Sequence, residues 1–167
     1  MEYGLSLGSN TGDRLSNLSQ AVTFIRLLED VTILQQSPVY ESEPQGMADD
    51  FKDELFLNTV LIIESTQTPM QMLSEFQAIE ENMGRPRNHG YNCPRTIDID
   101  IIYAEDLSVD IPGLIIPHPR WSSRRFVVQP LADIRPDIII PGSKSAVSEI
   151  LKTLPDKPQI QLFDAPM

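Results

Sequence analysis

The chain of 167 residues carries a formal net charge of −11, with 41% hydrophobic and 22% charged side chains. This composition is typical of a globular protein, and the acidic balance argues against a protein that binds nucleic acid or anionic membranes through a basic surface. The single cysteine, Cys93, excludes an intramolecular disulfide, and no signal peptide or long apolar segment is present. We therefore expect one domain, residues 1–167, in the cytoplasm.

The first part of the chain alternates between strand and helix patterns. Tyr3–Leu7 is a short apolar run, as expected of a strand. Apolar residues at helical spacing follow across 15–28, and Asp13 is among the candidate N-caps. Residues 31–36 give a second strand pattern, and the polar, aperiodic segment 41–54 after it predicts a loop.

A strand and a helix with clear boundaries come next. Leu55–Glu64 is strongly apolar and predicts a strand. Thr68 is followed by Pro69, and Gln71 lies three residues after Thr68. This is the pattern of a capping box with proline at the first helical position, and Gly84 predicts the end of the helix.

The last part begins with a loop over 85–94 and a β-branched strand over 96–104. The chain then becomes rich in proline, and residues 147–154 suggest one more helix. The order of elements is β-α-β-β-α-β followed by a C-terminal extension. This order predicts an α+β fold, a ferredoxin-like βαββαβ sandwich with a C-terminal extension.

The strand over 96–104 carries the most informative pattern. Asp98 and Asp100 are two residues apart and therefore face the same side, while the isoleucines between and beside them face the other. Two adjacent carboxylates repel each other and favour a bound cation. Mg²⁺ is commonly held by one or two carboxylates and completed by phosphate oxygens. The alternative is a solvated polar strand face.

Arginines gather around this strand. All six basic residues within 83–125 are arginines, namely Arg85, Arg87, Arg95, Arg120, Arg124 and Arg125. Guanidinium groups bind phosphate in a bidentate manner, and arginine together with paired carboxylates and Mg²⁺ serves phosphoryl transfer. The alternative is that each arginine pairs with a surface acid. A P-loop lysine motif and a zinc-type spacing of Cys and His are both absent from the sequence.

Three weaker patterns complete the set. Gln77 and Glu80 share one face of the predicted helix, and His118 lies between two prolines. Phe56 and Asn58 share one face of a strand, where a ring and an amide could hold a flat heterocycle. The alternatives are a solvated helix face, a structural histidine and an ordinary core phenylalanine.

Six motifs in order support a more specific prediction. They are Leu7-Gly8-Ser9-Asn10, Ser37-Pro38-Val39-Tyr40-Glu41-Ser42-Glu43-Pro44, Phe56-Leu57-Asn58, Gly84-Arg85-Pro86-Arg87, Pro94-Arg95-Thr96-Ile97-Asp98-Ile99-Asp100 and Ile116-Pro117-His118-Pro119-Arg120. In this order and spacing they resemble the 6-hydroxymethyl-7,8-dihydropterin pyrophosphokinase family over nearly the whole chain. The chain departs from the common family pattern at Asn92 and Cys93, where many members carry Trp-Gly.

The resemblance implies pyrophosphoryl transfer from ATP to the hydroxymethyl group of the dihydropterin, with release of AMP, in tetrahydrofolate biosynthesis. It implies two Mg²⁺ ions held by Asp98 and Asp100, which together with Arg85 and Arg95 form the catalytic set. The implied ATP contacts are Gln77, Glu80, Arg87, Ile101, His118 and Arg124. The implied pterin contacts are Ser42, Glu43, Gln45, Phe56, Asn58 and Phe126.

The resemblance implies that the partners are ATP and the pterin. We expect no nucleic-acid or membrane partner, and we expect the chain to act as a monomer. Two other functions share part of the pattern. A nucleotidyltransferase on the same type of sheet would also use the paired aspartates, but not Phe56, Asn58 and Phe126. A non-catalytic nucleotide-binding domain would have no use for arginines beside paired aspartates.

Overall fold

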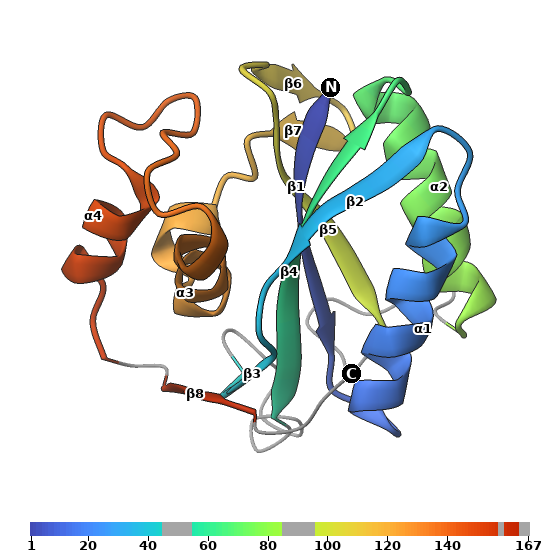
Figure 1. Ribbon diagram of the computed structural model, residues 1–167, viewed down its shortest axis with the longest axis horizontal. Coiled ribbons are helices and arrows are strands. Elements are labelled where there is room, and N and C mark those ends of the chain that lie inside the picture. Colours follow the sequence, from blue (N-terminus) through green and yellow to red (C-terminus); the bar gives the residue numbers. More distant parts are fainter. Residues whose placement is uncertain (45–54, 85–95, 157–158, 164–167) are drawn as a thin grey trace.

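The computed structural model describes residues 1–44, 55–84, 96–156 and 159–163. A mixed set of short and long strands forms one antiparallel sheet at its centre (Figure 1). The strands are β1 (Glu2–Ser9), β2 (Val31–Gln36), β3 (Tyr40–Ser42), β4 (Phe56–Ser65), β5 (Asp98–Ala104) and β8 (Ile160–Leu162).

The strand order confirms the ferredoxin-like prediction. β1 lies between β5 and β4, and all three strands run antiparallel to their neighbours. The other edge of β4 pairs with two strands in succession, β3 opposite residues 56–58 and β2 opposite residues 61–65. This is the arrangement of a βαββαβ unit whose second strand is interrupted. β8, from the C-terminal extension, adds a further strand beside β3.

Helices cover both faces of the sheet (Figure 1). α1 (Arg14–Arg26) and α2 (Pro69–Asn82) lie on one face, and α3 (Arg125–Ile134) lies on the other with α4 (Val147–Thr153) packed against it. A small hairpin of β6 (Val109–Ile111) and β7 (Leu114–Ile116) follows β5, and a 3₁₀ turn at Trp121–Ser123 leads into α3. Among the described residues, none of the helices has the length and hydropathy of a membrane span.

The helix ends follow the sequence signals. The side chain of Asp13 accepts a hydrogen bond from the backbone N–H of Ser16 at 3.1 Å, which caps α1. At α2 the capping box is complete: the backbone N–H of Thr68 donates to Gln71 Oε1 at 2.8 Å, and that of Gln71 donates to Thr68 Oγ1 at 3.3 Å. Gly84 has φ +99 just after the helix, a backbone conformation that glycine adopts readily.

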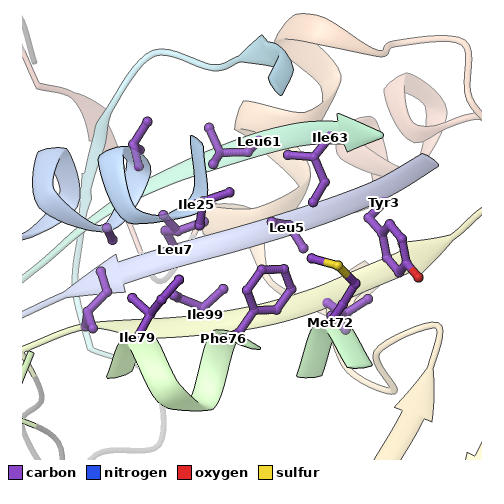
Figure 2. Packing of buried hydrophobic residues seen from close by; sticks show 14 of the residues in the cluster. Tyr3, Leu5, Leu7, Ile25, Leu61, Ile63, Met72, Phe76, Ile79 and Ile99 are labelled. Atoms are coloured by element: carbon purple, nitrogen blue, oxygen red, sulfur yellow. The ribbon is translucent and has the colours of Figure 1, made fainter. Parts of the chain in front are cut away.

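The core between the sheet and helices α1 and α2 is apolar and closely packed (Figure 2). Leu5 and Leu7 of β1 and Ile99 of β5 face Phe76 and Ile79 of α2 in this layer. All five side chains are buried, at 6% exposure or less. The isoleucine face of β5 therefore anchors the strand, and the opposite face carries its aspartates.

A second cluster lies between the sheet and α3. It contains Val60, Ile62, Ile102, Tyr103, Trp121, Val127, Val128, Leu131, Ile140 and Val147. The sequence prediction did not include α3, because Pro130 lies inside it and proline normally disfavours a helix interior. The helix is nevertheless amphipathic, and burial of its apolar face compensates for the missing hydrogen bond.

Three other elements differ from the prediction. β3 occupies the start of the segment predicted as a loop, where pairing with β4 and β8 fixes the chain. β5 begins at Asp98, two residues later than predicted, and the hairpin β6–β7 was not predicted. Each of these depends on strand partners distant in the sequence.

Candidate active site

Asp98 and Asp100 begin β5 and share one face of the strand, as predicted; this face is the α3 side of the sheet. Both are partly exposed, and the side chain of Asp100 is 37% exposed. In the register of β1 and β5, Asp98 lies opposite Gly8 and Asp100 lies opposite Ser6. The carboxylates therefore border small residues, which leaves open space beside them.

Glu80 approaches the same strand from α2. It is 9% exposed, and its Oε2 accepts a hydrogen bond from the backbone N–H of Ile99 at 3.3 Å. Among the strands of the described residues, β1 is the one neighbour of β5 in the sheet, and Glu80 contacts β5 from α2. A third acidic side chain thus lies beside the strand that carries Asp98 and Asp100. Gln77 is exposed one turn earlier on α2.

His118 lies directly after a cis Ile116–Pro117 peptide bond and is held beside β5. Its backbone N–H donates to the carbonyl oxygen of Ile102 at 2.9 Å. Its Nδ1 accepts a hydrogen bond from the backbone N–H of Arg120 at 3.1 Å, and its Nε2 lies 4.0 Å from Asp100 Oδ2. The segment thus directs the imidazole edge with Nε2 toward the carboxylates.

The protonation of His118 follows from its surroundings. Its pKa is lowered to about 4, mainly by burial and also by the charges of Arg124 and Arg120, against the opposing effect of Asp98. The imidazole is therefore neutral near pH 7. Because Nδ1 accepts a hydrogen bond, the proton lies on Nε2, which makes the imidazole a neutral donor rather than a cationic partner of Asp100.

A cavity of about 630 Å³ lies against the outer edge of β5. Its lining includes Asp100, Ile101 and His118 of the predicted site residues, together with Leu73 of α2. Ile99 and Pro119 also line the cavity, and the hairpin contributes Asp110, Ile111, Pro112, Gly113, Leu114 and Ile115. The volume is in the usual range of small-molecule sites, and the apolar walls suit a flat base. No sequence pattern predicted that the hairpin residues line a cavity, because only the folding of the chain brings them there.

A polar group lies on the other side of the carboxylates, across β1. Asn58 of β4 is opposite Gly8 and is 3% exposed. Its Nδ2 donates to Ser42 Oγ at 2.8 Å, and Ser42 is opposite Phe56 in the pairing of β3 with β4. The predicted pterin contacts Ser42, Phe56 and Asn58 are thus brought together by strand register.

Gly8 shapes the space beside this polar group. A Cβ added at Gly8 would lie 3.2 Å from Asn58 Oδ1 and 3.5 Å from Phe56 Cδ1. A side chain here would press on both residues, so glycine keeps the surface between Asn58 and Asp98 open. Neighbouring strands are about 4.8 Å apart, so Asn58 and Asp98 are separated by about 10 Å.

Arg124 and Phe126 lie at the start of α3. The guanidinium carbon of Arg124 is 5.5 Å from the centre of the Phe126 ring, a cation–π contact. Phe126 packs against the second cluster, on the same face of the sheet as Val60. The positive charge of Arg124 also acts on His118.

The other predicted residues are placed as follows. Glu43 is exposed after β3, and its backbone N–H donates to the carbonyl oxygen of Gln159 at 3.3 Å. Gln45, Arg85, Arg87 and Arg95 lie outside the described residues.

The donor set of the site bears on whether a cation can bind there. Within the described part of the chain, no group of three or more His, Cys, Asp or Glu side chains is arranged to hold a metal ion. Asp98 and Asp100 nevertheless offer two partly exposed carboxylates on one strand face. Two carboxylates suit Mg²⁺, which takes its remaining ligands from water and substrate phosphates.

The carboxylate pair thus lies between a cavity of about 630 Å³ and a buried amide, on a ferredoxin-like sheet. Comparison with known sequences identifies the class of protein. Residues 4–136 match the sequence model of the family described as 7,8-dihydro-6-hydroxymethylpterin-pyrophosphokinase (HPPK). The chain belongs to this family.

Individual relatives are consistent with the family match. The chain is 38% identical over 130 residues to a 2-amino-4-hydroxy-6-hydroxymethyldihydropteridine pyrophosphokinase of Bacillus subtilis, covering 78% of this chain and 75% of the relative. It is 33% identical over 151 residues to the Pseudomonas aeruginosa protein of the same name, covering 90% of each. It is 36% identical over 154 residues to the folic acid synthesis protein fol1 of Schizosaccharomyces pombe, covering 92% of this chain but only 20% of that relative.

Solved structures show the same fold. A crystal structure of Plasmodium falciparum HPPK-DHPS with pteroate superposes with a TM-score of 0.69 at 14% sequence identity, covering 90% of this chain and 42% of that one. At this identity the likeness concerns the fold alone.

Proposed function

We propose that this chain transfers a pyrophosphoryl group from ATP to 6-hydroxymethyl-7,8-dihydropterin and releases AMP, as a step of folate biosynthesis. One observation carries the proposal within the family: Asp98 and Asp100 lie between the cavity at the edge of β5 and the buried amide of Asn58. The two sides differ in chemistry, one apolar and open, the other an amide beside an aromatic ring. Two different substrates fit this asymmetry.

ATP occupies the cavity in this proposal. The base lies against Leu73, Ile101 and Leu114, which are apolar. The phosphates extend toward Asp98 and Asp100. His118 lies between the cavity and the carboxylates, where its Nε2–H can donate to a phosphate oxygen. Because the imidazole is neutral, it does not compete with a cation for the carboxylates.

Asp98 and Asp100 would hold Mg²⁺, and two ions are part of the proposal. When bound, Mg²⁺ neutralises the phosphate charge that two carboxylates alone would repel. The strand contributes rigidity: Ile97, Ile99 and Ile101 are buried on the opposite face, at 6% exposure or less. The carboxylates are thereby held in fixed positions before substrate binds.

The pterin lies over Gly8, between Phe56 and Phe126, in this proposal. Asn58 hydrogen-bonds the edge of the pterin ring in this proposal. Its Nδ2 donates to Ser42 Oγ, so its Oδ1 is oriented toward the space above Gly8. This fixed acceptor suits an N–H of the heterocycle. The separation of about 10 Å between Asn58 and Asp98 leaves room for the hydroxymethyl arm to reach the phosphates.

The reaction balances without a further reactant. The hydroxyl oxygen of the pterin forms a bond to the β-phosphorus, the bond between that phosphorus and the α–β bridging oxygen breaks, and AMP leaves. The hydroxyl proton is lost to solvent or buffer. We propose that Arg124, which contacts the Phe126 ring, neutralises phosphate charge together with Arg85, Arg87 and Arg95.

An assay of AMP release tests the proposal. Protein, Mg²⁺, ATP and the hydroxymethyl-dihydropterin are incubated, and nucleotides are separated by chromatography. We expect AMP and the pterin diphosphate in equal amounts. ADP as the product, AMP without pterin, or a preference for a nucleoside acceptor would contradict it.

The carboxylate pair is tested by substitution. Asp98→Asn and Asp100→Asn each keep the shape of the side chain, and we expect activity to fall by about 100-fold or more. Asp106→Asn is the matched control, since Asp106 is exposed after β5 and outside the cavity lining. Full activity of either site variant would exclude the pair as the metal site.

We also propose that the whole chain is one domain. Residues 137–163 extend past the matched region, yet α4 packs on α3 and β8 pairs with β3. A cytoplasmic location, a monomeric state and the absence of nucleic-acid or membrane partners stay predictions. Sedimentation and fractionation of the host cell test them directly.

A further inference from the structure

Arg14 is the first residue of α1 and has an unusual position for a cation. The N-terminus of a helix carries partial positive charge, so an arginine there is not favoured by the helix dipole. Asp13 at the N-cap supplies one negative charge at this helix end, and the first turn after it contains no acidic residue. The polar contacts of the Arg14 side chain are with residues outside the helix.

The guanidinium of Arg14 joins two segments that are distant in sequence. Nη2 lies 2.8 Å from Glu41 Oε2, with the two side chains 26% and 16% exposed. Nη1 donates to the backbone carbonyl oxygen of Leu55 at 3.0 Å. Glu41 belongs to β3, and Leu55 directly precedes β4. One side chain thus connects α1, β3 and the start of β4.

Both contacts are adjacent to residues of the pterin side. Glu41 precedes Ser42, and Leu55 precedes Phe56, while Ser42 and Phe56 are register partners. Successive residues of a strand point to opposite faces. Arg14 therefore holds the strands from the α1 face, and Ser42 and Phe56 are presented on the α3 face.

β3 depends on such support. It has only three residues, and Ser42 is the last of them. A short strand is held by few ladder hydrogen bonds, so the spacing between Ser42 and Phe56 is sensitive to any contact that ties β3 to β4. The hydrogen bond from Asn58 Nδ2 to Ser42 Oγ, at 2.8 Å, transmits a shift of β3 to the amide.

We propose that Arg14 is a positioning residue for pterin recognition: by joining Glu41 to the carbonyl of Leu55 it fixes the arrangement of Ser42, Phe56 and Asn58. Arg14 itself does not touch the substrate. The inference rests on the proposed function, because it assigns the pterin to that group of residues. It also gives a role to the segment from Gly8 to Arg14, of which the site otherwise uses only Gly8.

The test compares substrates in steady-state kinetics. For Arg14→Gln we expect KM for the pterin to rise about tenfold, since loss of positioning away from the reacting atoms weakens binding geometry. KM for ATP should stay within about twofold, because the cavity lies at the other edge of the sheet. Arg14→Lys keeps one of the two contacts and should show an intermediate value.

Two further variants separate positioning from general stability. Glu41→Gln removes the ion pair from the other side, and the double variant with Arg14→Gln should be no worse than Arg14→Gln alone, because both act through one contact. Arg26→Gln is the control: Arg26 is the exposed arginine at the other end of α1. It should leave KM for both substrates unchanged.

The outcomes are distinct. An unchanged pterin KM in Arg14→Gln, or an equal rise in KM for ATP and pterin, overturns the positioning role. The positioning role is also overturned if the rise in pterin KM follows the fall in melting temperature across all variants. Binding of the pterin, measured by calorimetry with Mg²⁺ and a non-hydrolysable ATP analogue, provides a second readout. A wild-type protein that neither binds nor converts the pterin refutes the proposed function, and this inference with it.

Discussion

Gly4 and Gly8 lie on the same strand and face the same side, yet the same substitution should affect them differently. A Cβ added at Gly4 would lie 2.3 Å from Tyr103 Cε1 and 2.6 Å from Cδ1. Contacts this short do not occur, so in Gly4→Ala either the ring or the strand must move. At Gly8 the shortest contact is 3.2 Å, to Asn58 Oδ1, and a shift of a few tenths of an ångström relieves it.

The cost at Gly4 follows from how Tyr103 is held. The ring is 1% exposed and belongs to the second core cluster. Its hydroxyl donates to Glu2 Oε2 at 2.8 Å, and that carboxylate pairs with Arg135 at 2.9 Å. Overpacking a core costs about 1–3 kcal/mol, and loss of the hydroxyl hydrogen bond adds about 1 kcal/mol. We expect Gly4→Ala to lower the free energy of unfolding by about 3 kcal/mol.

Gly8→Ala should show the opposite balance. The methyl group presses on Asn58 and Phe56, which are proposed to bind the pterin. We expect the free energy of unfolding to fall by about 1 kcal/mol or less and KM for the pterin to rise about fivefold. Gly4→Ala, assayed at a temperature where it is folded, should keep a pterin KM near that of the wild type.

Urea unfolding followed by fluorescence and circular dichroism measures both variants, and equal slopes against denaturant make the midpoints comparable. Tyr103→Leu removes the ring that Gly4→Ala would strike, so the double variant should lose less than the sum of the two single variants. A Gly4→Ala protein within about 0.5 kcal/mol of the wild type would refute the packing argument. The argument would also be refuted if the loss of unfolding free energy in the double variant equalled the sum of the losses in Gly4→Ala and Tyr103→Leu.

Two further predictions concern protonation and helix capping. The pKa of His118 is lowered to about 4, against 6.5 in an unfolded chain, so the unfolded state binds the proton more readily. The free energy of unfolding should therefore fall as pH drops from about 6.5 to 4. His118→Gln should remove this part of the pH dependence, which urea midpoints across that range measure. Thr68→Ala removes one half of the capping box at α2 and should lower the free energy of unfolding by about 1 kcal/mol, whereas Thr68→Ser should retain most of it; equal losses in both would contradict the capping role.

The sequence was sufficient where the signal is local. The capping box at Thr68 and the shared face of Asp98 and Asp100 depend only on neighbours within one turn or one strand, and both predictions are confirmed. The motif order also indicated the family correctly. α3 was not predicted because Pro130 argues against a helix, and its short amphipathic pattern is weak evidence on its own. The pattern becomes decisive only when the sheet surface that the helix covers is known.

The rest of the site depends on pairing between distant segments. Nothing near Gly8 in sequence indicates that Asn58 lies on one side of it and Asp98 on the other; the register of three strands decides this. The contact of Arg14 with Glu41 and Leu55 has the same origin. The hairpin that lines the cavity is likewise set by the return of the chain to β5.

The pairing of β8 with β3 has a practical consequence for how the protein can be joined to others. The backbone N–H of Phe163 donates to the carbonyl oxygen of Val39 at 2.9 Å, so the described C-terminal strand ends beside β3 (Figure 1). The amino group of Met1 donates to the carbonyl oxygen of Ser65 at 2.9 Å, at the other end of β4. These two ends of β4 are about 30 Å apart.

A tag or a second enzyme attached at the amino end would therefore lie far from Ser42 and Phe56, whereas one attached after residue 163 would begin at the neighbouring strand. The S. pombe relative, of which this chain spans 20%, shows that such a domain can belong to a much longer polypeptide. In any such fusion, tension or crowding after β8 would act on β3 first. β3 carries Ser42, so the proposed pterin contacts would be affected before the cavity at β5.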